Sequence, residues 1–198
     1  MGFGEAGQCG ARGGGGRGAD RRRGGSAATR PNLLLITLDT TRADRLGCYG
    51  HEQALTPNLN GLAEAGVLFE DVQSCVPITL PSHATILTGL APPEHGLRVN
   101  GEGRLPEDIP TLAEILRERG YRTGAVVASP VLARIHGLDR GFGHYDDRMP
   151  EAGASAPMRL RPDDDPQHAP YRPGSQVADA ALAWLAAAAP AGDGAAPW

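Results

Sequence analysis

The sequence predicts an α/β fold in which helices flank a mainly parallel sheet. Segments typical of strands, residues 32–39, 67–74 and 121–129, alternate with segments of helical periodicity. Alternation of this kind is characteristic of parallel sheets. The last helical segment, residues 175–189, ends before Pro190 and leads into no strand pattern. Because such a helix normally leads back into the sheet, we expect a sheet that is incomplete at its C-terminal end, in a chain that is part of a longer protein.

The strands are predicted from apolar runs of strand length. Residues 32–39 read NLLLITLD, a continuous apolar run that ends in an acid, as expected for a parallel strand buried on both faces. Residues 67–74, VLFEDVQS, follow a helical segment and its terminating glycine. Residues 121–129, YRTGAVVAS, form the next apolar run. All three are expected to lie in one sheet.

The helices are predicted from their caps and from the spacing of their apolar residues. Thr56 stands at an N-cap position, with Pro57 at the first helical position and Gly66 just past the end. Thr111 and Glu114 have the spacing of a capping box. Four helical segments result, at residues 56–66, 80–90, 110–120 and 175–189. The Pro- and Asp-rich residues 150–173 are predicted to form a loop.

Composition separates the first 30 residues from the rest. Residues 1–30 hold eleven glycines and six arginines and almost nothing large and apolar, so they cannot bury enough surface to offset the entropy of ordering. We expect a disordered tail, either an inert extension or an arginine-glycine segment that binds RNA. A misassigned start codon would also account for it.

Charge and hydropathy exclude several classes of partner. The net charge of -4 gives no reason to expect nucleic acid, and no stretch reaches eighteen apolar residues, so no membrane span is expected. No signal-peptide pattern is present in the chain as written, which leaves localisation open. The three cysteines, Cys9, Cys48 and Cys75, form no C-x-x-C pair and predict neither a disulfide framework nor a zinc knuckle.

Two residues at predicted strand and helix ends are candidates for chemistry. Asp39 follows a buried apolar run, at the end of a strand where α/β proteins bind ligands; it could bind a metal or cap a turn. Thr79 precedes Pro81, which fits the first position of a helix with Ser82 and His83 in its first turn. The N–H groups of such a turn bind tetrahedral oxyanions. Thr79 could be a nucleophile, if a divalent cation lowered the pKa of its hydroxyl, or a simple cap.

Three segments in this order and spacing resemble the sulfatase family of the alkaline phosphatase superfamily. They are residues 31–50, 56–72 and 79–90, and the resemblance extends to Trp184. It implies that residues 31–198 are an N-terminal part of a sulfatase-like catalytic domain. It also implies a divalent metal, with calcium, zinc and manganese as the alternatives, and further metal ligands in a D-x-x-x-H region that lies later in the sequences of the family.

The family motif identifies which side chain occupies the nucleophile position. Sulfatases carry C-x-P-S-R-A-x-x-L-T-G, whose first residue is converted to formylglycine. Cys75, followed by Val76 and Pro77, matches the first three positions of this motif. Ile78 and Thr79 then occupy the positions of its Ser and Arg. The distance from Cys75 to Gly89 is also four residues longer than the motif allows. Starting at Thr79, TLPSHATILTG matches at the right length. The resemblance therefore places Thr79 at the nucleophile position, although threonine is not a substrate for formylglycine conversion.

A second branch of the superfamily resembles this chain at other positions. Nucleotide pyrophosphatase/phosphodiesterases use an unmodified, metal-bound Thr in T-x-P-N-H-x-T-x-x-T-G, and His83 matches their His. They also carry an H-G-x-x-x-N segment whose Asn contacts the oxyanion, and HGLRVN places Asn100 at that position. From the residues alone, Asn100 could equally be a turn residue.

The sequence thus predicts a metal-dependent hydrolase of small-molecule sulfate or phosphate esters. Asp39 and Thr79 would bind the metal, Thr79, His83 and Asn100 would be catalytic, and Ser82 and Asn100 would bind substrate. The 198-residue chain by itself is expected to be inactive. The alternatives are a non-catalytic fragment or degenerate family member, and a phosphodiesterase or phosphomonoesterase of the same superfamily.

Overall fold

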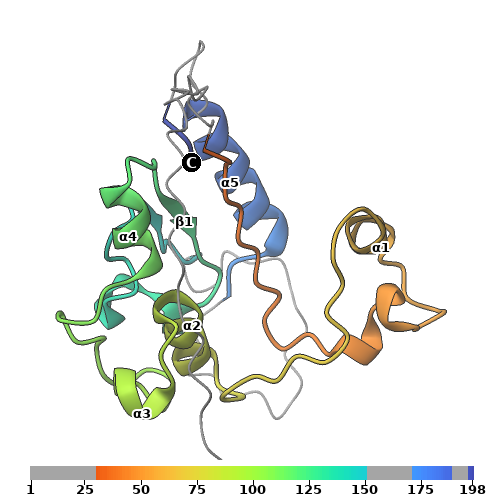
Figure 1. The fold of residues 1–198 in the computed structure, drawn as a ribbon, viewed down its shortest axis with the longest axis horizontal. Coiled ribbons are helices and arrows are strands. Elements are labelled where there is room, and N and C mark those ends of the chain that lie inside the picture. The colour runs from red at the N-terminus through yellow and green to blue at the C-terminus, as the bar shows by residue number, and fades with distance from the viewer. Residues whose placement is uncertain (1–29, 151–170, 189–195) are drawn as a thin grey trace, which may run out of the picture. The chain divides into compact units, whose positions relative to one another are not determined.

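The computed structural model describes residues 30–150, 171–188 and 196–198 (Figure 1). The predicted tail at residues 1–30, except Arg30, and most of the predicted loop at 150–173 lie outside the described residues. None of the helices in the described part is long and apolar enough to cross a membrane.

Helices predominate over strands in the described part (Figure 1). The α-helices are α1 (Pro57–Ala65), α2 (Thr79–Thr88), α3 (Pro92–His95), α4 (Leu112–Glu118) and α5 (Gly174–Ala188). Short 3-10 helices are η1 (Ala43–Arg45), η2 (Gly47–Tyr49), η3 (Pro130–Leu132) and η4 (Arg134–His136). The strands are β1 (Gly124–Val126) and β2 (His144–Asp146).

The sheet of the described part consists of β1 and β2, which are parallel, as predicted for this fold. Gly124 pairs with His144 and Val126 with Asp146. Helix α5 packs on β1, so closely that a Cβ atom on Gly124 would lie 2.4 Å from the Trp184 ring. Glycine at position 124 therefore allows the helix to approach the sheet.

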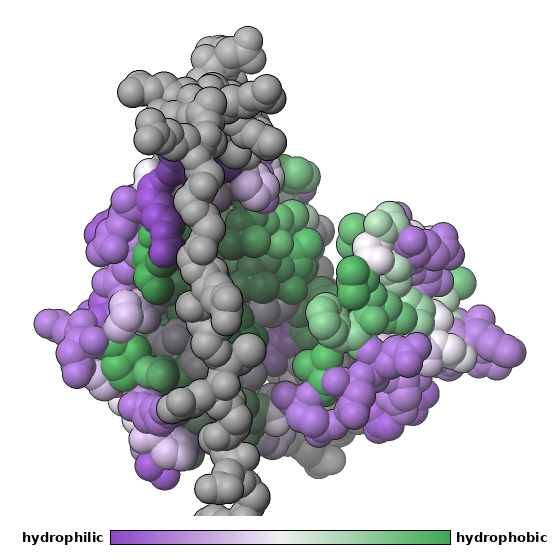
Figure 2. Space-filling model, viewed as in Figure 1, coloured by the Kyte–Doolittle hydropathy of each residue, from purple (hydrophilic) through white to green (hydrophobic). Residues whose placement is uncertain are grey.

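The predicted strands at residues 32–39 and 67–74 are not strands in the structure. A strand requires a neighbouring backbone to hydrogen-bond with, and an apolar strand also requires cover on its faces. The large apolar side chains of residues 33–38 are instead 50–65 % exposed, and Figure 2 shows apolar surface on the face viewed. The third predicted strand, at 121–129, is confirmed but shorter, as β1.

The extended segment 31–39 nevertheless runs in the same direction as β1. At its start, the Tyr121 hydroxyl donates to the Pro31 carbonyl at 3.0 Å, just before β1 begins. Leu33 N–H donates to the Trp198 carbonyl at 2.8 Å. At its end, Asp39 contacts α2, which packs against η3, the element that follows β1. The end of the segment that carries Asp39 therefore lies on the same side as the carboxyl end of β1.

All four predicted helices form, with one difference in register. The capping box of α4 is confirmed, because Thr111 Oγ1 accepts from Glu114 N–H at 3.1 Å and Glu114 Oε2 accepts from Thr111 N–H at 2.8 Å. Helix α2 begins at Thr79 and not at Pro81. Proline is tolerated throughout the first turn, where N–H groups lack helical partners, so it does not specify the starting residue.

The core gathers around the buried face of α2. Leu80 and Ala84 are completely buried, and they pack with leucines from the segments before and after β1. Those leucines are Leu97, Leu105, Leu132 and Leu138. Because Leu80 directly follows Thr79, burial of Leu80 holds the start of α2 in place and leaves Thr79 half-buried at the edge of the core.

Buried His95 makes stability depend on pH. Its Nδ1 accepts from Leu97 N–H at 3.2 Å, so Nε2 carries the proton and donates to Thr85 Oγ1 at 3.1 Å. Burial lowers the pKa of His95, because the charged imidazolium is poorly solvated inside the protein. The unfolded chain therefore takes up a proton before the folded chain does, and the free energy of unfolding falls as the pH drops below about 6.5.

We expect His95→Gln to flatten this dependence. Glutamine does not titrate, and its amide can replace the Nε2–H donor to Thr85. Denaturant unfolding of both proteins at about pH 7 and about pH 5 measures the difference. An equal loss of stability in the variant would contradict the assignment to His95.

Candidate functional site

The structure brings Asp39 and Thr79 together across forty positions of sequence. Thr79 Oγ1 donates to Asp39 Oδ2 at 3.0 Å. Asp39 ends the extended segment and is exposed, whereas Thr79 is the first residue of α2. A carboxylate and a hydroxyl thus face one another at the carboxyl end of the sheet, where α/β proteins place their ligands.

The backbone next to Asp39 has an unfavourable conformation. Thr40 has a φ of 55°, a left-handed conformation that β-branched residues rarely adopt. Its N–H donates to Asp39 Oδ1 at 3.0 Å, so Thr40 holds the carboxylate whose other oxygen faces Thr79. Such strain costs about 1–3 kcal/mol and is concentrated at functional sites, which supports a role for this turn in orienting Asp39.

The N-terminus of α2 offers fewer free donors than the sequence suggests. Leu80 N–H donates to Asn100 Oδ1 at 2.8 Å, Pro81 has no N–H, and Ser82 N–H donates to the Ile78 carbonyl at 3.0 Å. With α2 starting at Thr79, Ser82 and His83 lie two residues further into the helix than expected. An oxyanion could therefore use only the Thr79 N–H in this stretch, together with side chains.

Asn100 lies beside Thr79 through its contact with Leu80. Because Asn100 Oδ1 accepts from Leu80 N–H, the two N–H groups of its Nδ2 atom remain available as donors. Asn100 is exposed, so these donors are accessible to a ligand. The contact also caps the helix from another segment, since the N-cap residue Ile78 has no polar side chain.

His83 connects Thr79 with a residue that the sequence did not suggest. Its Nδ1 lies 2.8 Å from the Thr79 carbonyl oxygen and its Nε2 lies 3.1 Å from Thr37 Oγ1. Thr37 is the only polar residue among the six that precede Asp39 from Leu33 onward. The spacing of Thr37 and Asp39 could have indicated this role. The two residues are two positions apart, and alternate residues of an extended chain face the same side.

The donor set at Asp39 and Thr79 fits a hard divalent cation. Both donors are oxygens, and their separation of 3.0 Å equals that of neighbouring ligands about 2.1 Å from one ion at right angles. Within the described ranges, no group of three or more His, Cys, Asp or Glu side chains converges on a common point. Asp39 and Thr79 could thus supply two ligands of a larger set.

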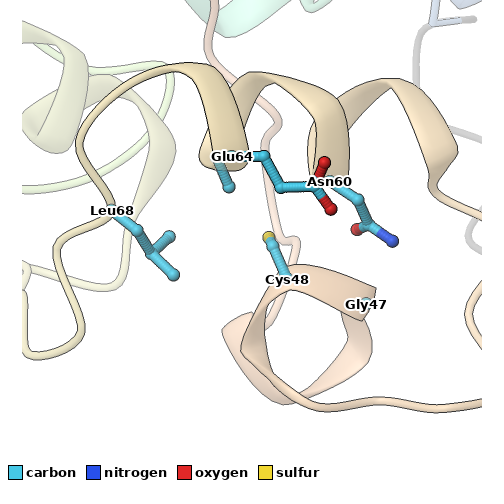
Figure 3. A pocket seen from close by; sticks show the side chains of 6 residues that line it. Gly47, Cys48, Asn60, Glu64 and Leu68 are labelled. Atoms are coloured by element: carbon cyan, nitrogen blue, oxygen red, sulfur yellow. The ribbon is translucent and has the colours of Figure 1, made fainter.

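Two hollows of the described part lie away from these residues. One, of about 300 Å³, lies between η2 and α1, where Cys48 points toward the helix (Figure 3). Another, of about 260 Å³, lies near the start of β1 and β2 and is lined by residues that include Arg122 and Trp184. Cys75 is exposed and has a free thiol. The case for the Asp39–Thr79 site therefore depends on hydrogen-bond geometry and not on a cavity.

Comparisons with known proteins agree with the sequence motifs. A family model described as Sulfatase matches residues 31–189. Bovine (Bos taurus) arylsulfatase A is 43 % identical over 104 residues, which are 50 % of this chain and 20 % of that protein. The chain therefore spans about a fifth of the length of the curated relatives that it matches.

Solved structures give the same result. A 2-O GAG sulfatase superposes with a TM-score of 0.53 at 28 % identity, over 69 % of this chain and 27 % of the other. The phosphonate monoester hydrolase of Agrobacterium radiobacter superposes with a TM-score of 0.51 at 31 % identity, over 62 % and 26 % of the two chains. With the family model covering most of the chain, these likenesses establish that it belongs to the sulfatase family of the alkaline phosphatase superfamily.

Proposed function

We propose that this chain carries the nucleophile, Thr79, and two metal ligands, Asp39 and Thr79, of a hydrolase that cleaves sulfate or phosphate esters of small molecules. The observation that supports it most directly is the hydrogen bond of 3.0 Å between Thr79 Oγ1 and Asp39 Oδ2. Position 79 is also where the family motif begins in this sequence. The proposal extends the sulfuric ester hydrolase character of the family to specific residues.

Thr79 would act as the nucleophile. Its Oγ1 would attack the sulfur or phosphorus in line with the ester oxygen and release its proton to solvent, and the bond from that atom to the ester oxygen would break as the alcohol leaves with a proton from solvent. A threonyl ester forms, and water then hydrolyses it and regenerates the hydroxyl. In the structure the hydroxyl proton is directed at Asp39, so a lone pair of Oγ1 is free to face the substrate.

Asp39 and Thr79 would both contact a divalent cation, which when bound lowers the pKa of a coordinated hydroxyl and neutralises substrate charge. Asp39 holds its orientation through the Thr40 N–H. Two protein oxygens are few for a cation that takes six or more ligands. We therefore expect the 198-residue chain alone to bind metal weakly and to show no turnover.

Asn100 would stabilise the charge that develops on the transferred group. Its Nδ2 donors are free because its Oδ1 is engaged by Leu80 N–H, and fixed amide donors near developing negative charge lower the barrier. Ser82, whose N–H is used within the helix, could contribute through its hydroxyl. These roles for Asn100 and Ser82 are proposals.

A panel of substrates tests the proposal. The complete gene product should hydrolyse at least one of an aryl sulfate, an aryl phosphate monoester and an aryl phosphodiester when supplied with Ca²⁺, Mn²⁺ or Zn²⁺. Chelation should abolish the activity. Absence of turnover of all three esters with every metal, in a folded protein, would favour a non-catalytic family member instead.

A phosphoester substrate is the second candidate. The observations in its favour are His83 where sulfatases have Arg, and Asn100 next to the start of α2. The fold is also shared with a phosphonate monoester hydrolase. In the panel, a higher kcat/KM for the phosphodiester than for the aryl sulfate would select this candidate.

A further inference from the structure

We propose that His83 is a positioning residue that, together with Thr37, holds Thr79 against Asp39. The inference rests on the proposed function, since it assigns His83 the task of placing the nucleophile and not of touching the substrate. It also assigns one hydrogen of the ring, which lies on Nδ1.

The proton assignment follows from the two partners of the ring. The Thr79 carbonyl oxygen can only accept, so Nδ1 at 2.8 Å must carry a hydrogen. On the other side of the ring, Nε2 is hydrogen-bonded to the Thr37 hydroxyl at 3.1 Å. The ring thus spans a backbone carbonyl of α2 and a side chain of the extended segment.

Two matching spacings make this a two-point attachment. Thr37 and Asp39 are two positions apart on an extended chain, which separates them by about 6.6 Å on one side. Thr79 and His83 are four positions apart on a helix, which separates them by about 6 Å on one face. The pairs Thr37–His83 and Asp39–Thr79 therefore meet without distortion and set the register of the segment against the helix.

Loss of either contact would let the segment shift along the helix. The apolar side chains of the segment do not prevent this, because those of residues 33–38 are half or more exposed. The polar contacts Thr37–His83 and Asp39–Thr79 must therefore do much to fix the register of the segment against the helix. Displacements of about 1 Å at a nucleophile are costly to catalysis, whereas binding of substrate elsewhere is unaffected.

The first test is spectroscopic and does not require activity. Long-range ¹H–¹⁵N correlation spectra of the 198-residue chain distinguish a protonated from an unprotonated ring nitrogen. We expect a protonated Nδ1 at His83. His95 is the internal reference, because its Nδ1 accepts from Leu97 N–H and carries no hydrogen. An unprotonated Nδ1 at His83 would overturn the proposal.

The second test uses matched variants of Thr37. Thr37→Val keeps the shape and removes the hydroxyl, and Thr37→Ser keeps the hydroxyl. In the complete gene product we expect Thr37→Val to lower kcat about tenfold, the effect of one lost hydrogen bond, with KM changed less than about twofold. Thr37→Ser should restore kcat.

The outcomes separate this inference from the proposed function. If Thr37→Val changed neither kcat nor the His83 spectrum, the attachment would be refuted even though Thr79 remained the nucleophile. If KM and stability changed but kcat did not, His83 and Thr37 would be structural only, which also contradicts the proposal. If Thr79→Ala left hydrolysis intact, the proposed function would fail while the hydrogen on Nδ1 of His83 could still be measured.

Discussion

Replacing Thr79 with alanine in the complete gene product is expected to lower kcat by at least about 10³-fold. The reason is that no other hydroxyl of the described residues contacts Asp39 from α2, and loss of a nucleophile removes the covalent step itself. Steady-state hydrolysis of the best ester from the panel measures the effect. The variant should fold normally, because Thr79 contributes one partly exposed hydrogen bond to stability.

Two further substitutions make the Thr79 test specific. Cys75→Ala should leave kcat unchanged, since Cys75 is exposed and precedes the helix by four residues. Thr79→Ser should retain part of the activity, because it keeps a hydroxyl at the same place. If Cys75→Ala inactivated the protein and Thr79→Ala did not, the motif would begin at Cys75 and the proposed nucleophile would be wrong.

Replacing Asp39 with asparagine is expected to weaken binding of the divalent cation by at least about 100-fold. Even outer-shell substitutions weaken metal binding by about 10- to 100-fold, and this change removes the charge of a direct ligand while keeping its size. Hydrolysis should fall in parallel and recover partly at high metal concentration. Calorimetric titration of the complete gene product with Ca²⁺ and Mn²⁺ measures the affinity.

Asp44→Asn is the matched control for Asp39. Asp44 lies on the same surface stretch and forms an exposed ion pair with Arg42 at 2.5 Å, which lowers the pKa of the Asp44 carboxyl. Exposed pairs of this kind contribute little to stability, and Asp44 has no contact with Thr79. Equal loss of metal affinity in both variants would indicate a general electrostatic effect and would refute a metal site at Asp39.

The helices could be predicted from sequence because their signals are local. The capping box of Thr111 and Glu114 and the Pro57–Gly66 boundaries of α1 involve residues only a few positions apart, and the structure confirms both. The start of α2 was missed by two residues, because Pro81 is compatible with several positions in a first turn. The motif around Thr79 likewise identified the family without a structure.

The strands and the site depend on distant partners. NLLLITLD has the composition of a buried strand, yet whether it forms one depends on backbones and layers beside it, and in the described part it remains extended and exposed. The sequence predicted that Asp39 and Thr79 would meet because both were expected to bind one metal. The hydrogen bond of 3.0 Å between them is known only from the tertiary structure.

The sequence by itself determined the α/β class, the helices and the membership in the sulfatase family, because each depends on neighbours along the chain. Only the tertiary structure decided that Asn100 caps α2 and that Thr37 joins His83. These contacts link residues 20 and 46 positions apart. No periodicity or cap encodes such a pairing, because it exists only after the extended segment and the helix have packed in one register.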